Sequence, residues 1–315
     1  MPSDRFPTAH YVAPVKTTTI NVDAVRVAAK PSNLWRDAWR DIRRRPTFWV
    51  TGVLVLLVVL MAAWPTLFTP VPPDTECFLA NSNGGPSSGH PLGFTFQGCD
   101  IWSRIVWGAR TSLLVGLLAT LISTVLGVVM GALAGFYGGW LDSVLSRVGD
   151  IFFAIPYILA AIVVMSVFSQ NRTPLLLAFA IGGFAWASTA RVIRSEVLRV
   201  RQADFVTASR AIGLSRFRTL LAHVLPNALA PVIVVATITL GTAISAEATL
   251  SFLGVGLGSG TMSWGLDISQ AQSSLRVAPL ALIYPSIALT VTVLAFIILG
   301  ELLRDALDPK ARARR

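Results

Sequence analysis

The sequence has little charge and very little lysine, and each shortage excludes a class of protein. Only 13% of its 315 residues are charged and 54% are hydrophobic, whereas a soluble domain averages about 25% charged residues. Lysine occurs only at Lys16, Lys30 and Lys310, so no lysine completes a G-x-x-x-x-G-K-[ST] phosphate loop. The composition therefore predicts a membrane protein that does not bind ATP by that route.

Residues for metal binding or nucleophilic catalysis are also scarce. The three histidines, His10, His90 and His223, are too scattered for an H-E-x-x-H zinc site, and they suggest no Ser–His–Asp set. The glycine-rich stretch 254–260 lacks the G-x-G-x-x-G spacing and the flanking βαβ unit of a dinucleotide site. We therefore expect a chain that is not an enzyme and that binds no cofactor or metal itself.

Long uncharged runs are what the sequence does contain. Each reaches or exceeds the roughly 18 apolar residues that a membrane-spanning helix needs. The runs are Phe48–Phe68, Thr111–Leu141, Ile151–Asn171, Thr173–Ala190, Val224–Ala246 and Val277–Gly300. The sequence therefore predicts an all-α integral membrane protein with six transmembrane helices.

The distribution of Lys and Arg predicts the orientation in the membrane. With a cytoplasmic N-terminus, only Arg104, Arg110, Arg172 and Arg276 of the 26 Lys and Arg residues fall outside, which is a strong positive-inside bias. Both termini are then cytoplasmic. The net charge of +10 needs no nucleic-acid partner, because topology and attraction to anionic membrane lipids explain it.

The predicted topology divides the chain into six segments. The first apolar run is too long for the apolar region of a signal peptide, so we expect an uncleaved anchor. Before it, one helix face carries Leu34, Trp35, Ala38, Trp39 and Ile42 and the other carries Arg and Asp, which predicts an amphipathic interfacial helix. The segments are a disordered cytoplasmic tail (1–32), an amphipathic interfacial helix (33–46), the first transmembrane helix (47–69), an extracytoplasmic loop (70–110), a five-helix core (111–309) that includes a long cytoplasmic loop (191–224), and a basic cytoplasmic tail (310–315).

The extracytoplasmic loop and its end hold two pairs of notable residues. Cys77 and Cys99 share the loop, so an oxidising compartment would allow a disulfide; two unpaired thiols are the alternative. Arg104 and Arg110 lie at the entry to the second span. They either extend to lipid head groups or help to receive a docking protein.

The spans contain no obvious source of energy for transport. Proton- and ion-coupled carriers usually keep ionisable residues inside the bilayer. Here Glu247 lies near the outer end of the fifth predicted span and Glu301 near the inner end of the sixth, and we expect both at the membrane interface. If this protein moves a solute, the energy comes from a partner.

The second span carries glycines at a regular spacing. Gly127, Gly131 and Gly135 lie four residues apart, which makes a flat helix face that another backbone can approach closely. Packing within the protein is the expected role, with a moving gate as the alternative.

The segment 203–227 is unusually long for a connector between spans. Asp204 is placed to cap a short helix, Gly213 suits the C′ position that ends it, and Ser215 can start another helix toward Leu225 and Pro226. One face of the first helix would carry Phe205, Ala208, Ser209 and Ile212. This face could lie on the membrane or insert into a groove of another protein.

At these residues the chain resembles the permease subunits of bacterial ABC importers. Their cytoplasmic pattern E-A-A-x-x-x-G-x9-I-x-L-P is matched by Thr207-Ala208-Ser209, by Gly213 and by His223-Val224-Leu225-Pro226. The likeness is strongest to the second permease of dipeptide, oligopeptide and nickel importers. It is carried by HPLG (90–93), SRIVWGARTSLLVG (103–116), HVLPNALAPVIV (223–234), EATLSFLGVGL (247–257) and Ser263-Trp264-Gly265.

The resemblance implies a type I importer permease fold and a peptide translocation pathway in the cytoplasmic membrane. It implies a second permease, two ATPases that bind ATP and Mg, and an extracytoplasmic binding protein as partners. The helix would be a coupling helix that contacts an ATPase. Its contact residues would be Asp204, Phe205, Thr207, Ala208, Ser209, Arg210, Ile212, Gly213, Leu225 and Pro226.

The chain departs from the family pattern at two positions of that contact. Thr207 stands where Glu is frequent, and Ser209 replaces the second Ala. Three other functions remain open from the sequence: a nickel-complex permease of the same family, a membrane scaffold that binds a partner without ATPase activity, and a proton-coupled carrier, which the empty spans disfavour.

Overall fold

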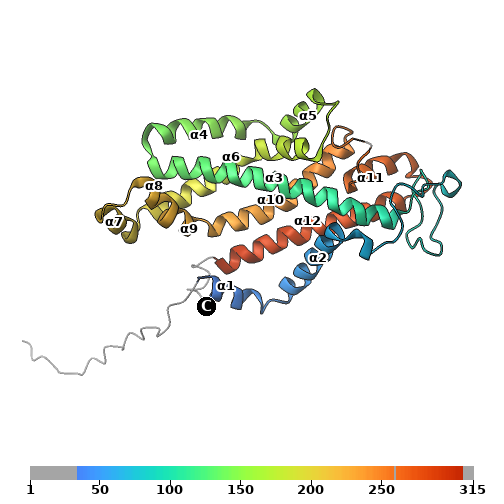
Figure 1. Ribbon diagram of the computed structural model, residues 1–315, viewed down its shortest axis with the longest axis horizontal. Coiled ribbons are helices and arrows are strands. Elements are labelled where there is room, and N and C mark those ends of the chain that lie inside the picture. The colour runs from blue at the N-terminus through green and yellow to red at the C-terminus, as the bar shows by residue number, and fades with distance from the viewer. Residues whose placement is uncertain (1–33, 259, 308–315) are drawn as a thin grey trace, which may run out of the picture.

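The computed structural model describes residues 34–258 and 260–307, and this part of the chain is helical without a β-strand. The predicted tails 1–32 and 310–315 lie outside the described residues. Figure 1 shows long helices lying side by side, with shorter helices gathered at the two ends of the bundle.

Five helices in the described ranges are long and apolar enough to cross a membrane, and they cover five of the six predicted spans. They are α2 (Pro46–Ala63), α3 (Ile101–Tyr137), α6 (Pro174–Arg201), α10 (Ala230–Phe252) and α12 (Leu280–Leu307). The all-α class with multiple spans is therefore confirmed.

The third predicted span is broken. Instead of one helix over 151–171, the chain forms α4 (Gly139–Ala154) and α5 (Tyr157–Val167), which are bent by 79° at the junction. Ile155 and Pro156 separate them. Proline lacks the N–H that a continuous helix needs, and it disfavours a helical conformation at the residue before it.

The second span begins ten residues earlier than the uncharged run indicated. Asp100 caps α3, and its side chain accepts a hydrogen bond of 2.8 Å from the Ser103 N–H. At 1.5 Å per residue, the 37 residues of α3 span about 55 Å, well beyond the roughly 30 Å of a hydrocarbon core. Arg104 and Arg110 therefore belong to the first turns of α3, which precede the uncharged run.

The regularly spaced glycines lie where α3 crosses α6. A Cβ atom at Gly127 would come within 2.6 Å of the Thr189 Cβ, and one at Gly135 within 2.8 Å of the Arg194 carbonyl oxygen. Gly131 faces the carbonyl of Ala190. The three glycines thus allow close backbone contact within this chain, which agrees with packing as their role.

The short helices form two opposite ends of the bundle (Figure 1). One end holds α7 (Asp204–Ala211), α8 (Arg216–Thr219), a π-helical turn (Leu220–Val224) and α9 (Leu225–Ala228); the other holds α11 (Trp264–Ala271) and the loop that follows α2. The helix α1 (Leu34–Ile42) packs Ala38 and Ile42 against α12. We call the first of these ends the α7 end and the second the α11 end.

Candidate functional site

The helix α7 is attached through one face only. Val206 and Ser209 are buried, and Val206 packs in a cluster with Val200 and Leu220. The Ser209 hydroxyl donates a 2.7 Å hydrogen bond to the Val206 carbonyl. The hydrogen bond lies within α7, and the packing of Val206 holds α7 against the end of α6 and the π-helical turn.

The opposite face of α7 is exposed in the described part of the chain. Phe205 is 47% exposed and Ile212 is 78% exposed, and Thr207 and Ala208 between them are exposed as well. The predicted face is therefore correct for Phe205, Ala208 and Ile212. It is wrong for Ser209, because the helix turns that residue inward onto the body.

The ends of α7 agree with the sequence at one terminus and differ at the other. Gly213 has φ +89°; its N–H bonds the Arg210 carbonyl at 3.0 Å, and the Leu214 N–H bonds the Ser209 carbonyl at 3.2 Å. This is the Schellman arrangement with glycine at C′, as predicted. Asp204 is not the cap, because α7 begins at Asp204 itself and Ala203 precedes it with no side-chain cap.

The segment after α7 returns to the bundle. Ser215 caps α8 by accepting a 3.3 Å hydrogen bond from the Arg218 N–H, as the sequence indicated. Leu225 packs partly buried against the same cluster as Val206, whereas Pro226 is exposed. The residues matched to the importer pattern therefore include both anchoring and exposed positions.

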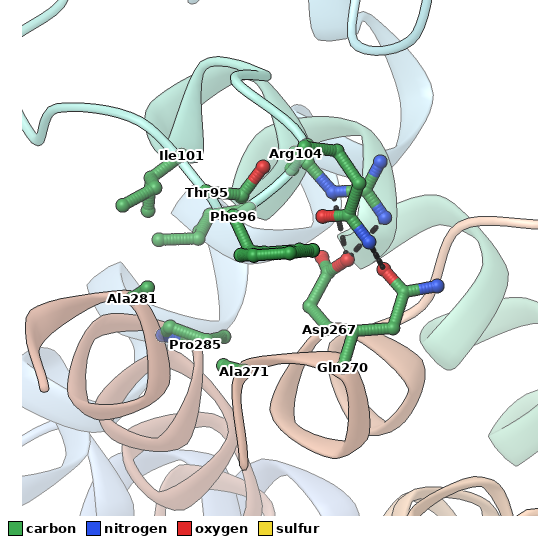
Figure 2. Close-up of a pocket in the computed structure, with 11 residues that line it drawn as sticks. Thr95, Phe96, Ile101, Arg104, Asp267, Gln270, Ala271, Ala281 and Pro285 are labelled. Atoms are coloured by element: carbon green, nitrogen blue, oxygen red, sulfur yellow. Dashed lines mark hydrogen bonds and ion pairs between the residues drawn. The ribbon is translucent and has the colours of Figure 1, made fainter. Parts of the chain in front are cut away.

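At the α11 end, a buried ion pair joins α3 to α11. Arg104 Nε lies 2.8 Å from Asp267 Oδ1, and the two side chains are only 11% and 7% exposed. Figure 2 shows them facing each other beside Gln270, where a cavity of about 10 Å³ remains. Burial raises the pKa of the Asp267 carboxyl, and the Arg104 guanidinium opposes that rise.

This ion pair bears on one expectation from the sequence. The Arg104 side chain binds Asp267 and is only 11% exposed, so it is less accessible to lipid head groups or to a docking protein than an exposed arginine. Arg110 is exposed and stays available for either role. Nothing in the sequence identified Asp267 as the partner of Arg104. The one feature that could have drawn attention to it is that it is an isolated acidic residue between two apolar runs.

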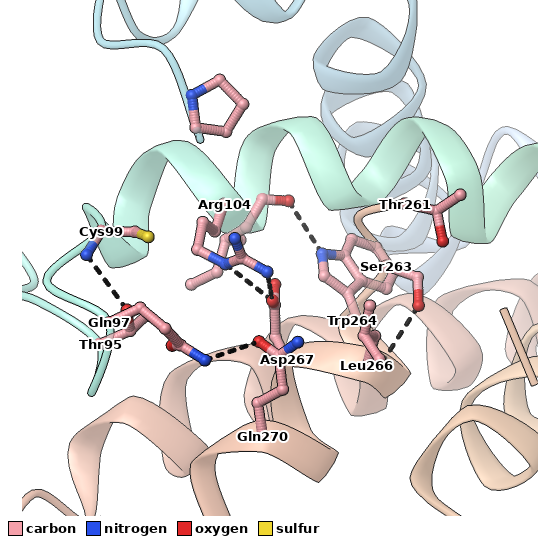
Figure 3. A network of polar contacts seen from close by, with 12 residues as sticks. Thr95, Gln97, Cys99, Arg104, Thr261, Ser263, Trp264, Leu266, Asp267 and Gln270 are labelled. Atoms are coloured by element: carbon pink, nitrogen blue, oxygen red, sulfur yellow. Dashed lines mark hydrogen bonds and ion pairs between the residues drawn. The ribbon is translucent and has the colours of Figure 1, made fainter. Parts of the chain in front are cut away.

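Further contacts tie the loop between α2 and α3 to the same place (Figure 3). Gln97 donates to Gln270 at 3.4 Å, and the Trp264 indole N–H donates to the Ile105 carbonyl at 2.8 Å. In the structure Cys77 and Cys99 form a disulfide. The loop, the start of α3 and α11 therefore form one connected unit.

Glu247 has buried partners that the sequence did not indicate. It is fully buried in α10, where it accepts hydrogen bonds from Ser112 at 3.0 Å and from Ser251 at 2.9 Å. Three helices enclose it near the end of α10, since the Trp264 N–H of α11 also bonds the Ser112 hydroxyl of α3 at 3.3 Å. The serine four residues after Glu247 was the one local sign of this network.

The break between α4 and α5 opens a cavity that the sequence did not indicate. It measures about 350 Å³, and its lining includes Pro156 and Tyr157 at the break, Ser188 of α6, and Thr239 and Thr242 of α10. Irregular backbone at membrane depth is tolerated where it lines a cavity. Broken helices of this kind are where transporters commonly hold their substrates.

Comparisons with known proteins place this architecture in a family. Residues 127–313 match the sequence family described as binding-protein-dependent transport system inner membrane component. Residues 33–86 match the N-terminal transmembrane domain of oligopeptide transport permease C. The first match covers more than half of the chain and includes the segment that carries α7.

Whole-chain relatives agree with these matches. The chain is 36% identical to the glutathione transport system permease protein GsiD of Pectobacterium atrosepticum, over 89% of this chain and 92% of the relative. It is 39% identical to the protein of the same name from Salmonella paratyphi A, over 88% and 91%.

A solved structure agrees in fold. The inward-facing MetNI methionine ABC transporter matches with a TM-score of 0.52 and 23% identity, over 64% of this chain and 96% of that chain. At that identity the likeness supports the fold alone. The family matches and the whole-chain relatives show that this chain belongs to the binding-protein-dependent transport system inner membrane component family. It is a multi-pass, non-catalytic permease subunit of an inner-membrane ABC importer.

Proposed function

We propose that this chain forms one half of a translocation pathway for small peptides and that α7 couples it to an ATPase. Permeases of this family work with ATPases and a substrate-binding protein. The peptide assignment is supported by relatives named for glutathione, which is itself a small peptide, and by the match to oligopeptide transport permease C. A second, different permease would complete the pathway.

The exposed apolar face of α7 is the observation that carries the coupling role. Phe205, Ala208 and Ile212 face away from the body, while Val206 and Ser209 anchor the helix. A capped helix with an unburied apolar face fits into a groove of another protein. ATP binding and hydrolysis, with Mg, would take place in the partner ATPases, whose movement α7 would pass to α6.

The cavity at the α4–α5 break is our candidate for a part of the peptide path. Its hydroxyl groups on Ser188, Thr239 and Thr242 can accept and donate hydrogen bonds to peptide backbone, and its aromatic residues, which include Phe152 and Tyr157, offer apolar contact. Alternating access would open this region to one side of the membrane at a time. Arg110, on the exposed outer part of α3, is the remaining candidate contact for the binding protein.

The proposal is tested by removing the apolar character of α7 without disturbing the chain itself. Ile212→Ser changes a side chain that is 78% exposed, and Val277→Ser changes an equally exposed side chain just before α12, beyond the α11 end. We expect Ile212→Ser to reduce both the ATPase retained by the purified permease and peptide uptake. Val277→Ser should leave ATPase retention unchanged.

Two results would argue against this function. If Ile212→Ser retained the ATPase and transported normally, α7 would not be the contact. If the chain purified from its host carried a protein without a phosphate loop in place of an ATPase, a scaffold role would be favoured. If the importer with its cognate binding protein took up nickel complexes but not peptides, the proposed substrate would be wrong. The coupling role of α7 would be unaffected.

A further inference from the structure

Three arginines surround one cavity at the α7 end. Arg201 from the end of α6, Arg210 from α7 and Arg216 from α8 line a space of about 210 Å³, together with Phe136 and Tyr137 at the end of α3. The lining residues come from four helices, and the first and last of them, Phe136 and Arg216, are 80 positions apart in the chain. All the charge they bring to it is positive.

None of these three arginines forms an ion pair with a carboxylate in the described part of the chain. The other arginines in the second half of α6 behave differently: Arg191 pairs with Asp150, Arg194 with Asp142, and Arg199 with Glu196. Arg201 lies within electrostatic reach of Asp142, but that carboxylate hydrogen-bonds Arg194. The cavity therefore differs from its surroundings in that no described carboxylate forms an ion pair with its arginines.

The contacts that the arginines do make leave donors free. Arg201 Nη1 donates to the carbonyl oxygens of Gly135 and Phe136, both at 3.1 Å, and so caps the end of α3. The Arg210 guanidinium lies 5.2 Å from the centre of the Phe136 ring. A guanidinium carries five N–H donors, so most donors of the three side chains have no protein acceptor among these contacts.

We propose that this cavity binds a phosphate group, either the head group of an anionic phospholipid or free phosphate. Arginine suits phosphate because its planar donors match the oxygens of the anion. The cavity also lies at the end of the spanning helix α3, beside Tyr137, a residue type enriched at the level of lipid head groups. Basic pockets between spanning helices bind anionic head groups in other membrane proteins.

The geometry favours phosphate over an acidic side chain of a partner protein. Arg210 is exposed, but its guanidinium lies 5.2 Å from the centre of the buried Phe136 ring, whereas the exposed α7 face of Phe205 and Ile212 offers the surface for a protein. Beside the cavity, the exposed apolar side chain of Phe217 follows Arg216 on α8, where it can enter the boundary between head groups and acyl chains.

An anion bound in this cavity would fix the position of α7 relative to the bundle. An anion between Arg201, Arg210 and Arg216 would remove the repulsion among the three cations and join α7 and α8 to the ends of α3 and α6. The binding inference depends on the cavity alone; its consequence for coupling rests on the proposed function.

The experiment uses the full chain purified with its partner subunits in lipid nanodiscs. One arm compares nanodiscs of phosphatidylcholine alone with nanodiscs that include phosphatidylglycerol, and measures phosphatidylglycerol retained on the complex by native mass spectrometry. The other arm titrates inorganic phosphate into the phosphatidylcholine sample and follows the thermal midpoint. The test variant is the double substitution Arg210→Gln and Arg216→Gln, which leaves Arg201 to cap α3.

Arg218→Gln is the matched control, since Arg218 is an exposed arginine on α8 that does not line the cavity. We expect the double variant to bind phosphatidylglycerol at least about tenfold more weakly than wild type, because each lost charge-assisted hydrogen bond weakens binding, and the control to bind as wild type. Stabilisation by inorganic phosphate that the double variant loses would identify free phosphate as the source. Equal retention by wild type and double variant together with no phosphate effect would overturn the proposal. So would loss of the ATPase with unchanged lipid and phosphate binding, which would assign the arginines to a protein contact.

Discussion

Replacing Gly213 tests how far the orientation of α7 governs transport. The residue has φ +89°, and a Cβ atom there would meet nothing within 4 Å. A substitution therefore acts through backbone conformation alone. An alanine in a left-handed conformation costs about 1–2 kcal/mol, which lowers the population of the turn by a factor of roughly 5–30.

Gly213→Pro is the stronger form of the same change. Proline fixes φ near −65°, so the turn cannot form, and the hydrogen bond from the Gly213 N–H to the Arg210 carbonyl is lost. That bond alone contributes about 0.5–1.5 kcal/mol. We expect Gly213→Ala to reduce peptide uptake partly and Gly213→Pro to abolish it, while the protein still inserts in the membrane.

The assay measures ATP hydrolysis and peptide uptake by the reconstituted importer, so that uncoupling shows as hydrolysis without matching uptake. Gly254→Ala is the control, because Gly254 also has positive φ, +76°, with open space around it, but follows α10 near the α11 end. It should leave the amount of bound ATPase unchanged. Normal uptake per ATP hydrolysed by Gly213→Pro would refute the reasoning.

Three further predictions concern the rest of the molecule. Arg104→Met leaves the buried Asp267 carboxylate without its partner, so we expect a loss of about 3–5 kcal/mol, seen as a lower thermal midpoint in detergent; Arg110→Met, at an exposed site, should melt like wild type. Cys77→Ser opens a disulfide that links residues 22 positions apart, which should destabilise the loop between α2 and α3 by about 3 kcal/mol. Faster proteolysis of this loop in the purified protein would show it. Thr242→Trp should fill the cavity at the α4–α5 break and reduce peptide uptake with the ATPase still bound; undiminished uptake would remove this cavity from the path.

Local chemistry in the sequence accounts for much of the fold. The uncharged runs predicted the spans because a hydrocarbon core accepts only long apolar helices. Gly213 and Ser215 marked the end of one short helix and the start of the next, because left-handed backbone and orphan N–H groups require those residue types. Pro156 lies inside the third apolar run, where the structure replaces one spanning helix by the bent pair α4 and α5, because proline cannot supply a helical N–H.

The orientation of charged and small polar side chains depended on contacts between distant parts of the chain. Arg104 and Asp267 are 163 positions apart, and Glu247 and Ser112 are 135 positions apart. No periodicity within one helix reveals such partners. The same limit explains Ser209, which lies on the predicted face by spacing but was turned inward by the packing of Val206 against Val200 and Leu220.

The sequence by itself determined that this protein crosses a membrane repeatedly, that it lacks the phosphate loop of an ATPase, and that a short helix ending at Gly213 stands between two spans. These properties follow from composition and from backbone chemistry along a few consecutive residues. Only the tertiary structure decided which side of that helix is free, where the buried charges find their partners, and that three arginines from different helices share one cavity. Those are properties of side chains brought together by packing, and packing is set by the whole chain at once.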